Sequence, residues 1–130
     1  MKTVVICGSN KFADKAREFA EKLEKLGVVV YVPHFYRASG GIWDRVHEFD
    51  KPFVALGLNN DHFYKISMAD VVFIYNQDGY SGNSTTLEIG YATALKKPIY
   101  ALSDQDEEIC RQVLFRGKIE TPEALLEKLK

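Results

Sequence analysis

Short segments that are apolar at nearly every position alternate along this chain with amphipathic segments of helical spacing. Three of the apolar segments are 2–7 (KTVVIC), 70–75 (DVVFIY) and 98–102 (PIYAL), and the first two are rich in β-branched residues. Strands that are apolar throughout, and not only at every second position, are typical of a parallel sheet with helices on both faces. The alternation therefore predicts an α/β fold.

We expect a single-domain, three-layer α/β/α architecture, flavodoxin-like or Rossmann-like, with a five-stranded parallel sheet in the order 2-1-3-4-5. Residues 1–130 are assigned to one domain because this length has room for one core and not for two. The other expected elements follow from helical spacing and from turn residues. Before the third apolar segment they are a helix over 12–26 ending at Gly27, a strand at 28–32, and two irregular helices within 33–69 that Pro52 and Gly57 interrupt, the second at about 61–68. A helix at 84–96 follows that segment. The C-terminal part is expected to contain a polar helix near 104–111, a short strand near 113–116 and a last helix from Pro122, capped by Thr121.

The charges of the chain nearly cancel, with 17 Lys and Arg against 18 Asp and Glu. Polymeric nucleic acids and anionic membrane surfaces are recognised by basic faces, so neither is expected as a partner. The N-terminus lacks the apolar stretch of a secretory signal, and no apolar run approaches the roughly 20 residues of a membrane span. We therefore expect a cytoplasmic protein.

Neither a disulfide framework nor a metal site is indicated by the cysteines and histidines. Cys7 and Cys110 are too few for a framework, and Cys7 is expected to pack as a small hydrophobe in its strand. His34 and His47 show no ligand spacing with each other or with the cysteines. No metal and no cofactor are predicted.

Two loops, 8–11 and 76–86, follow the first and third apolar strands, and ligands of parallel sheets bind at such carboxyl ends. In the first loop, Gly8, Ser9 and Asn10 bring backbone N–H groups and small polar groups to a helix start, which favours an anion. An ordinary turn capped by Ser9 or Asn10 is the alternative.

The second loop is rich in glycine and leads into a helix that carries Glu88. The segment 85–88 (TTLE) fits a capping box, in which Glu88 would bind a backbone N–H at the helix start. On the pattern alone the capping box is favoured, but a carboxylate in the first helical turn at this sheet edge is also well placed to contact a ligand. The pattern alone leaves both interpretations open.

Several segments together resemble the nucleoside 2-deoxyribosyltransferase superfamily, which includes 2′-deoxynucleoside 5′-phosphate N-hydrolases. They are 69–72 (ADVV), 87–92 (LEIGYA) and 97–99 (KPI), with the opening 7–9 (CGS) similar to the hydrolase branch. The resemblance covers most of residues 1–102. It implies that Glu88 attacks the anomeric carbon of a nucleoside and forms a glycosyl-enzyme, which is reasonable chemistry for an oxocarbenium-like transition state.

The sequence departs from that superfamily around the implied nucleophile. Gly82 stands where the transferases have a base-binding Asp and the hydrolases a Ser, with Ser81 and Asn83 beside it. His62, next to Asp61, stands where the family has another Asp. These differences indicate a divergent branch with a different substrate, or a binding protein that has lost the reaction.

We assign Glu88 as the nucleophile, with Asp61 or His62 as an acid or a sugar anchor. His62 has an alternative role, which is to pack a helix face beside Phe63 and Ile66. Tyr36 and Trp43 are candidate stacking groups or ordinary packing residues. The predicted substrate-binding residues are Gly8, Ser9, Asn10, Tyr80, Ser81, Gly82, Asn83, Ser84 and Thr86.

The leading hypothesis is an N-glycosidase that hydrolyses or transfers the pentosyl group of a small nucleoside or nucleotide. A non-catalytic nucleotide-binding module that uses the same pocket is the main alternative. A phosphoribohydrolase of the cytokinin-activating type is a third, because residues 82–88 (GNSTTLE) loosely resemble its glycine-rich motif. The resemblance also implies a homodimer or larger oligomer whose subunits share residues of the site.

Overall fold

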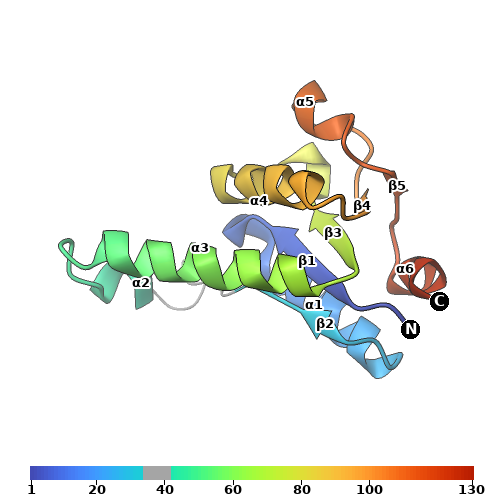
Figure 1. Cartoon of the computed structure of the whole chain (residues 1–130), viewed down its shortest axis with the longest axis horizontal. Helices are drawn as coiled ribbons and strands as arrows, with labels where there is room; N and C mark the ends of the chain where they lie inside the picture. The colour runs from blue at the N-terminus through green and yellow to red at the C-terminus, as the bar shows by residue number, and fades with distance from the viewer. Residues whose placement is uncertain (34–41) are drawn as a thin grey trace.

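The fold was obtained as a computed structural model, which describes residues 1–33 and 42–130 (Figure 1). In these residues, five short strands form one parallel sheet in the order β2-β1-β3-β4-β5. The strands are β1 (Val4–Gly8), β2 (Val30–Tyr31), β3 (Val71–Tyr75), β4 (Ile99–Ala101) and β5 (Gly117–Lys118). The predicted α/β fold and strand order are confirmed.

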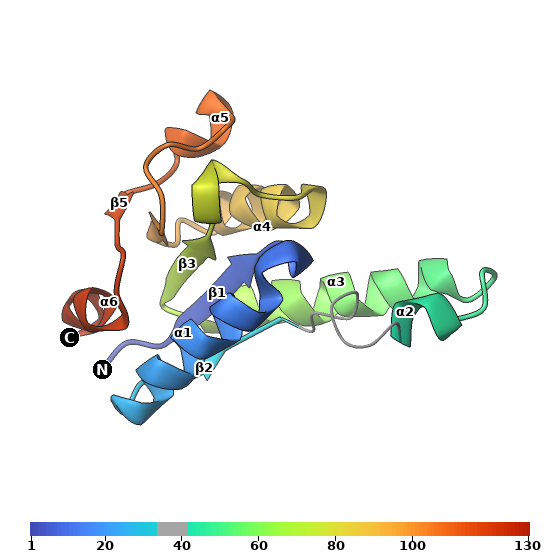
Figure 2. The same ribbon diagram turned by 180° about the vertical axis from the view of Figure 1, so that it is seen from behind.

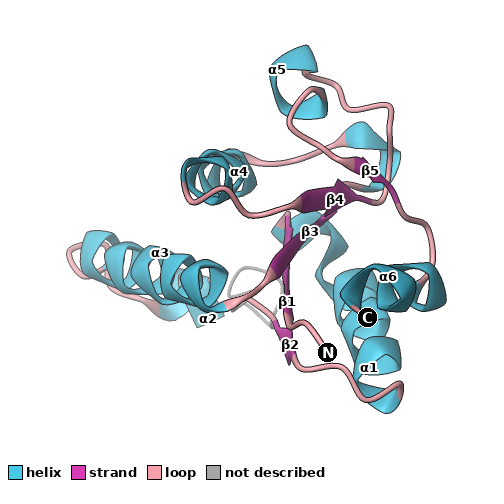
Figure 3. Ribbon diagram, turned by 45° about the vertical axis from the view of Figure 1, so that its right-hand side comes forward, coloured by secondary structure: helices cyan, strands magenta, loops and turns pink. Residues whose placement is uncertain are grey.

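Helices cover both faces of this sheet. The helices of the described residues are α1 (Ala13–Lys25), α2 (Ile42–Arg45), α3 (Lys51–Met68), α4 (Asn83–Ala94), α5 (Ile109–Gln112) and α6 (Pro122–Leu129), and the 3₁₀ turns are η1 (Asn10–Phe12) and η2 (Gln77–Gly79). Figures 2 and 3 show α1 and α6 on one face, and α3 and α4 on the other. In the described part of the chain, no helix is long and apolar enough to cross a membrane.

The central strand β1 contributes to two separate hydrophobic cores, because successive side chains of a strand point to opposite faces. Val4 and Ile6 belong to the core under α1 and α6. Val5 and Cys7 belong to the core under α3 and α4. All four side chains are fully buried. The continuously apolar sequence of β1 is thus explained by helices on both sides.

The segment before β3 differs from the prediction. From Lys51 to Met68 the chain forms one continuous helix, α3, so the expected interruption by Pro52 and Gly57 is wrong. Pro52 lies in the first turn, where its missing N–H would have no partner within the helix. Gly57 lies inside the helix, where glycine costs about 1 kcal/mol relative to alanine but does not end it.

The C-terminal elements and the second strand are shorter than predicted. The polar helix expected near 104–111 is the single turn α5, and the strand expected near 113–116 lies at Gly117–Lys118. The strand expected at 28–32 is only Val30–Tyr31. The terminal cap is as predicted, because the Thr121 hydroxyl accepts a hydrogen bond from the Ala124 N–H at 3.2 Å.

The start of α4 also corrects the interpretation of Glu88. The helix begins at Asn83 with Gly82 as its N-cap, three residues earlier than a capping box with Thr85 as N-cap requires. Glu88 therefore lies in the second turn, beyond reach of the cap, and the capping-box interpretation is wrong. Its side chain faces the sheet instead.

Candidate active site

Two adjoining pockets lie beyond the carboxyl ends of β1 and β3, and they share Gly8, Asn10 and Ser84. The first, here called the carboxylate pocket, is lined in addition by Pro33, Leu58, Asn59, His62, Phe63, Leu87 and Glu88. The second, here called the hydroxyl pocket, has a volume of about 430 Å³ and is lined in addition by Ser9, Lys11, Tyr80, Gly82, Asn83 and Thr85. The site therefore has one part with a carboxylate among apolar groups and one part rich in small polar groups.

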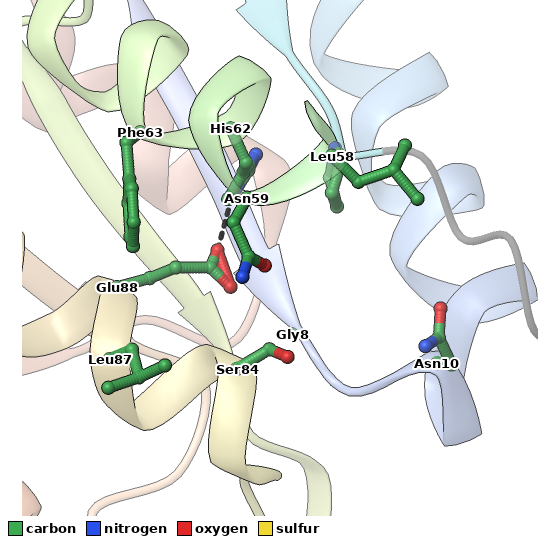
Figure 4. A pocket seen from close by; sticks show the side chains of 10 residues that line it. Gly8, Asn10, Leu58, Asn59, His62, Phe63, Ser84, Leu87 and Glu88 are labelled. Carbon is green, nitrogen blue, oxygen red and sulfur yellow. Dashed lines mark ion pairs between the residues drawn. The ribbon is translucent and has the colours of Figure 1, made fainter. Parts of the chain in front are cut away.

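Glu88 and His62 meet in the wall of the carboxylate pocket (Figure 4). Glu88 extends from α4 and His62 from α3, and Oε2 of the glutamate lies 2.6 Å from Nε2 of the histidine. Their side chains are only 10% and 7% exposed. This contact pairs the two side chains through Nε2, while the other ring nitrogen, Nδ1 of His62, is buried and has no hydrogen-bond partner among the described residues.

Cys7 lies behind this pair, at the end of β1. Its Sγ is 3.2 Å from Nε2 of His62. Burial raises the pKa of the Cys7 thiol well above its usual value, and the nearby carboxylate of Glu88 raises it further. The cysteine is therefore a neutral thiol. It packs as a hydrophobe, as expected, but it also contacts the titratable pair.

Helical spacing explains why these side chains converge. In α4 the buried residues Thr85, Glu88, Ile89 and Ala92 lie on one face, so the carboxylate points toward the sheet. In α3, His62 and Ile66 are one turn apart and both are buried. Contact between the rings of Phe63 and Tyr91, with centroids 4.9 Å apart, helps to fix the spacing of the two helices.

The hydroxyl pocket is formed where the two loops approach each other. A Cβ atom added at Gly82 would lie 3.8 Å from Oγ of Ser9. The Ser9 hydroxyl accepts a hydrogen bond from the Lys11 N–H, which confirms Ser9 as the cap of η1. Gly82, as the N-cap of α4, has no side chain to cover the first N–H groups of that helix. These groups and the adjacent hydroxyls favour an anion.

The C-terminal segment supports the second loop from behind. Asn76 binds the backbone of Ser103 and the carboxylate of Asp106. Asp106 forms a buried ion pair with Arg111 at 2.8 Å. Gly79 has φ +75° and lies so close to Gln105 that an added Cβ would clash with its carbonyl oxygen. Only glycine fits there, and the loop is held in one position.

Three predicted site residues lie outside the lining of both pockets. The carboxylate of Asp61 pairs with Lys65 at 2.8 Å. Ser81 is buried within the loop between η2 and α4. The Thr86 hydroxyl donates to the Gly82 carbonyl at 3.0 Å and accepts from Arg111 at 3.3 Å, which ties α4 to the supporting segment.

The aromatic candidates are distributed differently. Tyr80 lines the hydroxyl pocket, and the Lys11 ammonium lies 4.8 Å from the centre of its ring. Trp43 contacts Lys51, whose ammonium lies 5.4 Å from one of its rings. Tyr36 and His34 lie outside the described residues.

The predicted site residues leave out eight residues that line or adjoin the site: Lys11, Pro33, Leu58, Asn59, Phe63, Thr85, Leu87 and Cys7. Leu58 stands four residues before His62, so helical spacing would have placed it on the same face once α3 was known to be continuous. Nothing in the sequence near Cys7 points to His62, which is 55 residues away.

The fold and the site define an α/β protein whose candidate ligand cleft lies at the carboxyl edge of a parallel sheet. Residues 5–123 match the family described as nucleoside 2-deoxyribosyltransferase. The chain belongs to this family. No curated protein matches the sequence significantly.

Two solved structures share the fold. A 2-deoxyribosyltransferase from Leishmania mexicana is 21% identical with a TM-score of 0.52, and the match covers 79% of this chain and 66% of that enzyme. The CMP N-glycosidase BcmB from Clostridium botulinum is 17% identical with a TM-score of 0.52, and the match covers 98% of this chain and 97% of that protein. At these identities the likeness concerns the fold.

Proposed function

We propose that this protein cleaves the N-glycosidic bond of nucleosides or nucleoside 5′-monophosphates, with Glu88 as the nucleophile. The observation on which the proposal rests is the nearly buried carboxylate in a pocket wall, 2.6 Å from an imidazole and at the carboxyl edge of the sheet. Membership of the nucleoside 2-deoxyribosyltransferase family supports the substrate class.

In the proposed reaction, an oxygen of Glu88 forms a bond to the anomeric carbon while the bond to the base nitrogen breaks. The electron pair of the broken bond leaves with the base, which takes up a proton. Water then attacks the same carbon and loses a proton to the solvent, which balances the proton taken up by the base. This step releases the Glu88 carboxylate and gives the free sugar or its 5′-phosphate. A second base in place of water would give transfer.

His62 is the better placed of the two candidate acids, because it lines the pocket and Asp61 does not. A proton on its Nε2 would stabilise the charge of Glu88 and hold the carboxylate in one orientation. The same imidazole faces the space into which a sugar hydroxyl would enter. We therefore propose His62 as the residue that positions the nucleophile and contacts the sugar.

The hydroxyl pocket is proposed to hold the 5′-phosphate. Ser9, Asn83 and Ser84 line it, and so does Lys11, whose ammonium lies 4.8 Å from the ring centre of Tyr80 in the same wall. The uncovered N-terminus of α4 adds backbone N–H donors. Monophosphates are therefore the preferred substrates in this proposal.

The test is release of free base from a panel of ribo- and deoxyribonucleosides and their 5′-monophosphates, followed by chromatography. Glu88→Gln should lower the rate by about a thousandfold or more, because it removes the nucleophile. Glu21→Gln, on the exposed face of α1, is the matched control and should act like the unmodified protein. A rate unchanged in Glu88→Gln would refute the proposal. Saturable binding by calorimetry, with no base released, would identify a nucleotide-binding module instead.

A second copy of this chain is proposed to cover the outer face of α3. Phe53, Leu56 and Tyr64 recur there at helical spacing, with Phe49 just before the helix, and each is more than half exposed. Leu56→Glu should lower the mass in solution from a multiple of 14.8 kDa to 14.8 kDa. Light scattering after size exclusion measures this, and a monomeric unmodified protein would contradict it. The cytoplasmic location stays a prediction.

A further inference from the structure

Cys7, His62 and Glu88 bring three different ligand atoms together at one point of the cleft. The thiol, imidazole and carboxylate atoms all lie within 4.8 Å of one another. They come from three separate elements, β1, α3 and α4, and all three residues are buried. The proposed hydrolysis uses the carboxylate and the imidazole but has no role for the thiol.

We propose that these three residues form a binding site for a thiophilic divalent cation such as Zn²⁺, and that the bound cation blocks Glu88. Sulfur and imidazole ligands favour zinc over magnesium or calcium, which prefer oxygen ligands alone. Three protein ligands and a fourth coordination position that is open to a pocket are a common arrangement for zinc.

The distances suit a tetrahedral ion after small side-chain movements. Bond lengths of about 2.3 Å to sulfur and 2.0 Å to nitrogen would place these two atoms about 3.5 Å apart. Sγ of Cys7 lies 3.2 Å from Nε2 of His62, and that nitrogen lies 2.6 Å from Oε2 of Glu88. An ion bound between the three side chains would take the place of the contact between Nε2 of His62 and Oε2 of Glu88 and would increase the distance between these two atoms.

The close packing of these atoms also favours an ion. Oε2 of Glu88 is buried and lies against the imidazole of His62. An ion bound between the three atoms would be coordinated by all of them at once. On binding, the Cys7 thiol would release its proton to the solvent and ligate as a thiolate.

A bound cation would occupy the lone pair with which Glu88 attacks the anomeric carbon. The cation would then act as a reversible inhibitor, an effect that rests on the proposed function. Binding itself does not rest on it, because it requires only the three side chains.

Cobalt(II) titration of the chelator-treated full chain tests the cation site directly. A thiolate-to-cobalt charge-transfer band should grow to saturation at one ion per chain. Cys7→Ala should abolish the band, and Cys110→Ala, which changes the exposed cysteine, should leave it intact. His62→Gln keeps the thiol and should weaken binding by more than about tenfold. Circular dichroism verifies that each variant is folded.

Absence of the band in the unmodified protein would overturn the proposal, as would a band that survives Cys7→Ala or disappears in Cys110→Ala. Base release is measured in parallel with and without Zn²⁺. A saturable band with no base release from any substrate would support the cation site and contradict the proposed function. Base release without a band would support the proposed function and contradict the cation site.

Discussion

The two cores on opposite faces of the sheet contain different kinds of side chain, although β1 and β3 contribute to both. Under α1 and α6, the core consists of apolar and aromatic side chains, with Phe19 stacked on Phe73 at 4.7 Å between ring centroids. Under α3 and α4, the apolar core continues into Cys7, His62 and Glu88.

Burying polar groups costs free energy unless they are fully paired, so the second face is expected to contribute less to stability. Alternate residues of one strand thus serve separate purposes. Ile6 points into a core that holds the fold together, and Cys7 points toward the candidate site. The following changes test whether stability and activity divide between the faces in this way.

The largest effect on stability is expected from Phe73→Ala, in the core under α1 and α6. The ring is fully buried, so its removal leaves a cavity and should lower the free energy of unfolding by about 3–5 kcal/mol. Denaturant titration measures this. Base release per folded molecule should change little. A loss of stability below about 1 kcal/mol would contradict the account of this core.

On the other face, His62→Gln should affect activity more than stability. Loss of the imidazole beside Glu88 should lower turnover by about a hundredfold, which is about 2.7 kcal/mol of transition-state stabilisation. The free energy of unfolding should stay within about 1 kcal/mol or rise, because a buried polar contact is removed. Undiminished turnover with reduced stability would assign His62 to packing alone.

Lys11→Gln tests the hydroxyl pocket, with a smaller effect. Loss of the ammonium should raise KM for a monophosphate about tenfold, or about 1.4 kcal/mol, as for one charged hydrogen bond. The KM for the corresponding nucleoside should change much less. Lys15→Gln, one turn further along, is the control. Equal changes for both substrates would contradict a phosphate site here.

The smallest effect on stability is expected from Asp70→Asn, at the amino ends of the strands and opposite the candidate site. A hydrogen bond from the Thr3 N–H, at 2.8 Å, holds the pKa of Asp70 below its ordinary value. The resulting stability is present above about pH 3.9, the unfolded value, and is lost as the pH falls through the lower folded value. Asp70→Asn should therefore cost less than about 1 kcal/mol at pH 7 and nothing in strong acid. Denaturation at the two pH values measures it, and a cost that persists in acid would contradict the assignment.

The central strands could be predicted because their sequences are apolar throughout, which is typical of a parallel sheet covered on both faces. Their order could be predicted because it is a common order of flavodoxin-like folds, in which strands and helices alternate. The continuity of α3 could not, since Pro52 and Gly57 are breakers in most positions and only their place in the helix makes them acceptable. Glu88 was found through its resemblance to a family motif. Its position in the second helical turn depends on where α4 begins, and the glycine-rich sequence before the helix does not determine that residue.

The convergence of Cys7, His62 and Glu88 is a tertiary feature that no local pattern encodes. In sequence, Cys7 is an apolar residue in an apolar strand, and only the register of β1 directs it toward α3. The roles of Ser81 and Thr86 were equally hidden. Both belong to the polar segment 76–86, which resembles a binding loop in sequence, yet Ser81 is buried and Thr86 lies inside α4, where it binds Arg111.

The most direct test of the central claim is to trap the glycosyl-enzyme. The protein is mixed with a substrate that releases base, quenched in acid within one turnover, digested and analysed by mass spectrometry. We predict a pentosyl or phosphopentosyl adduct on the peptide that contains Glu88, and none in Glu88→Gln. An adduct on another residue, or base release in the Glu88→Gln variant at the unmodified rate, would contradict it.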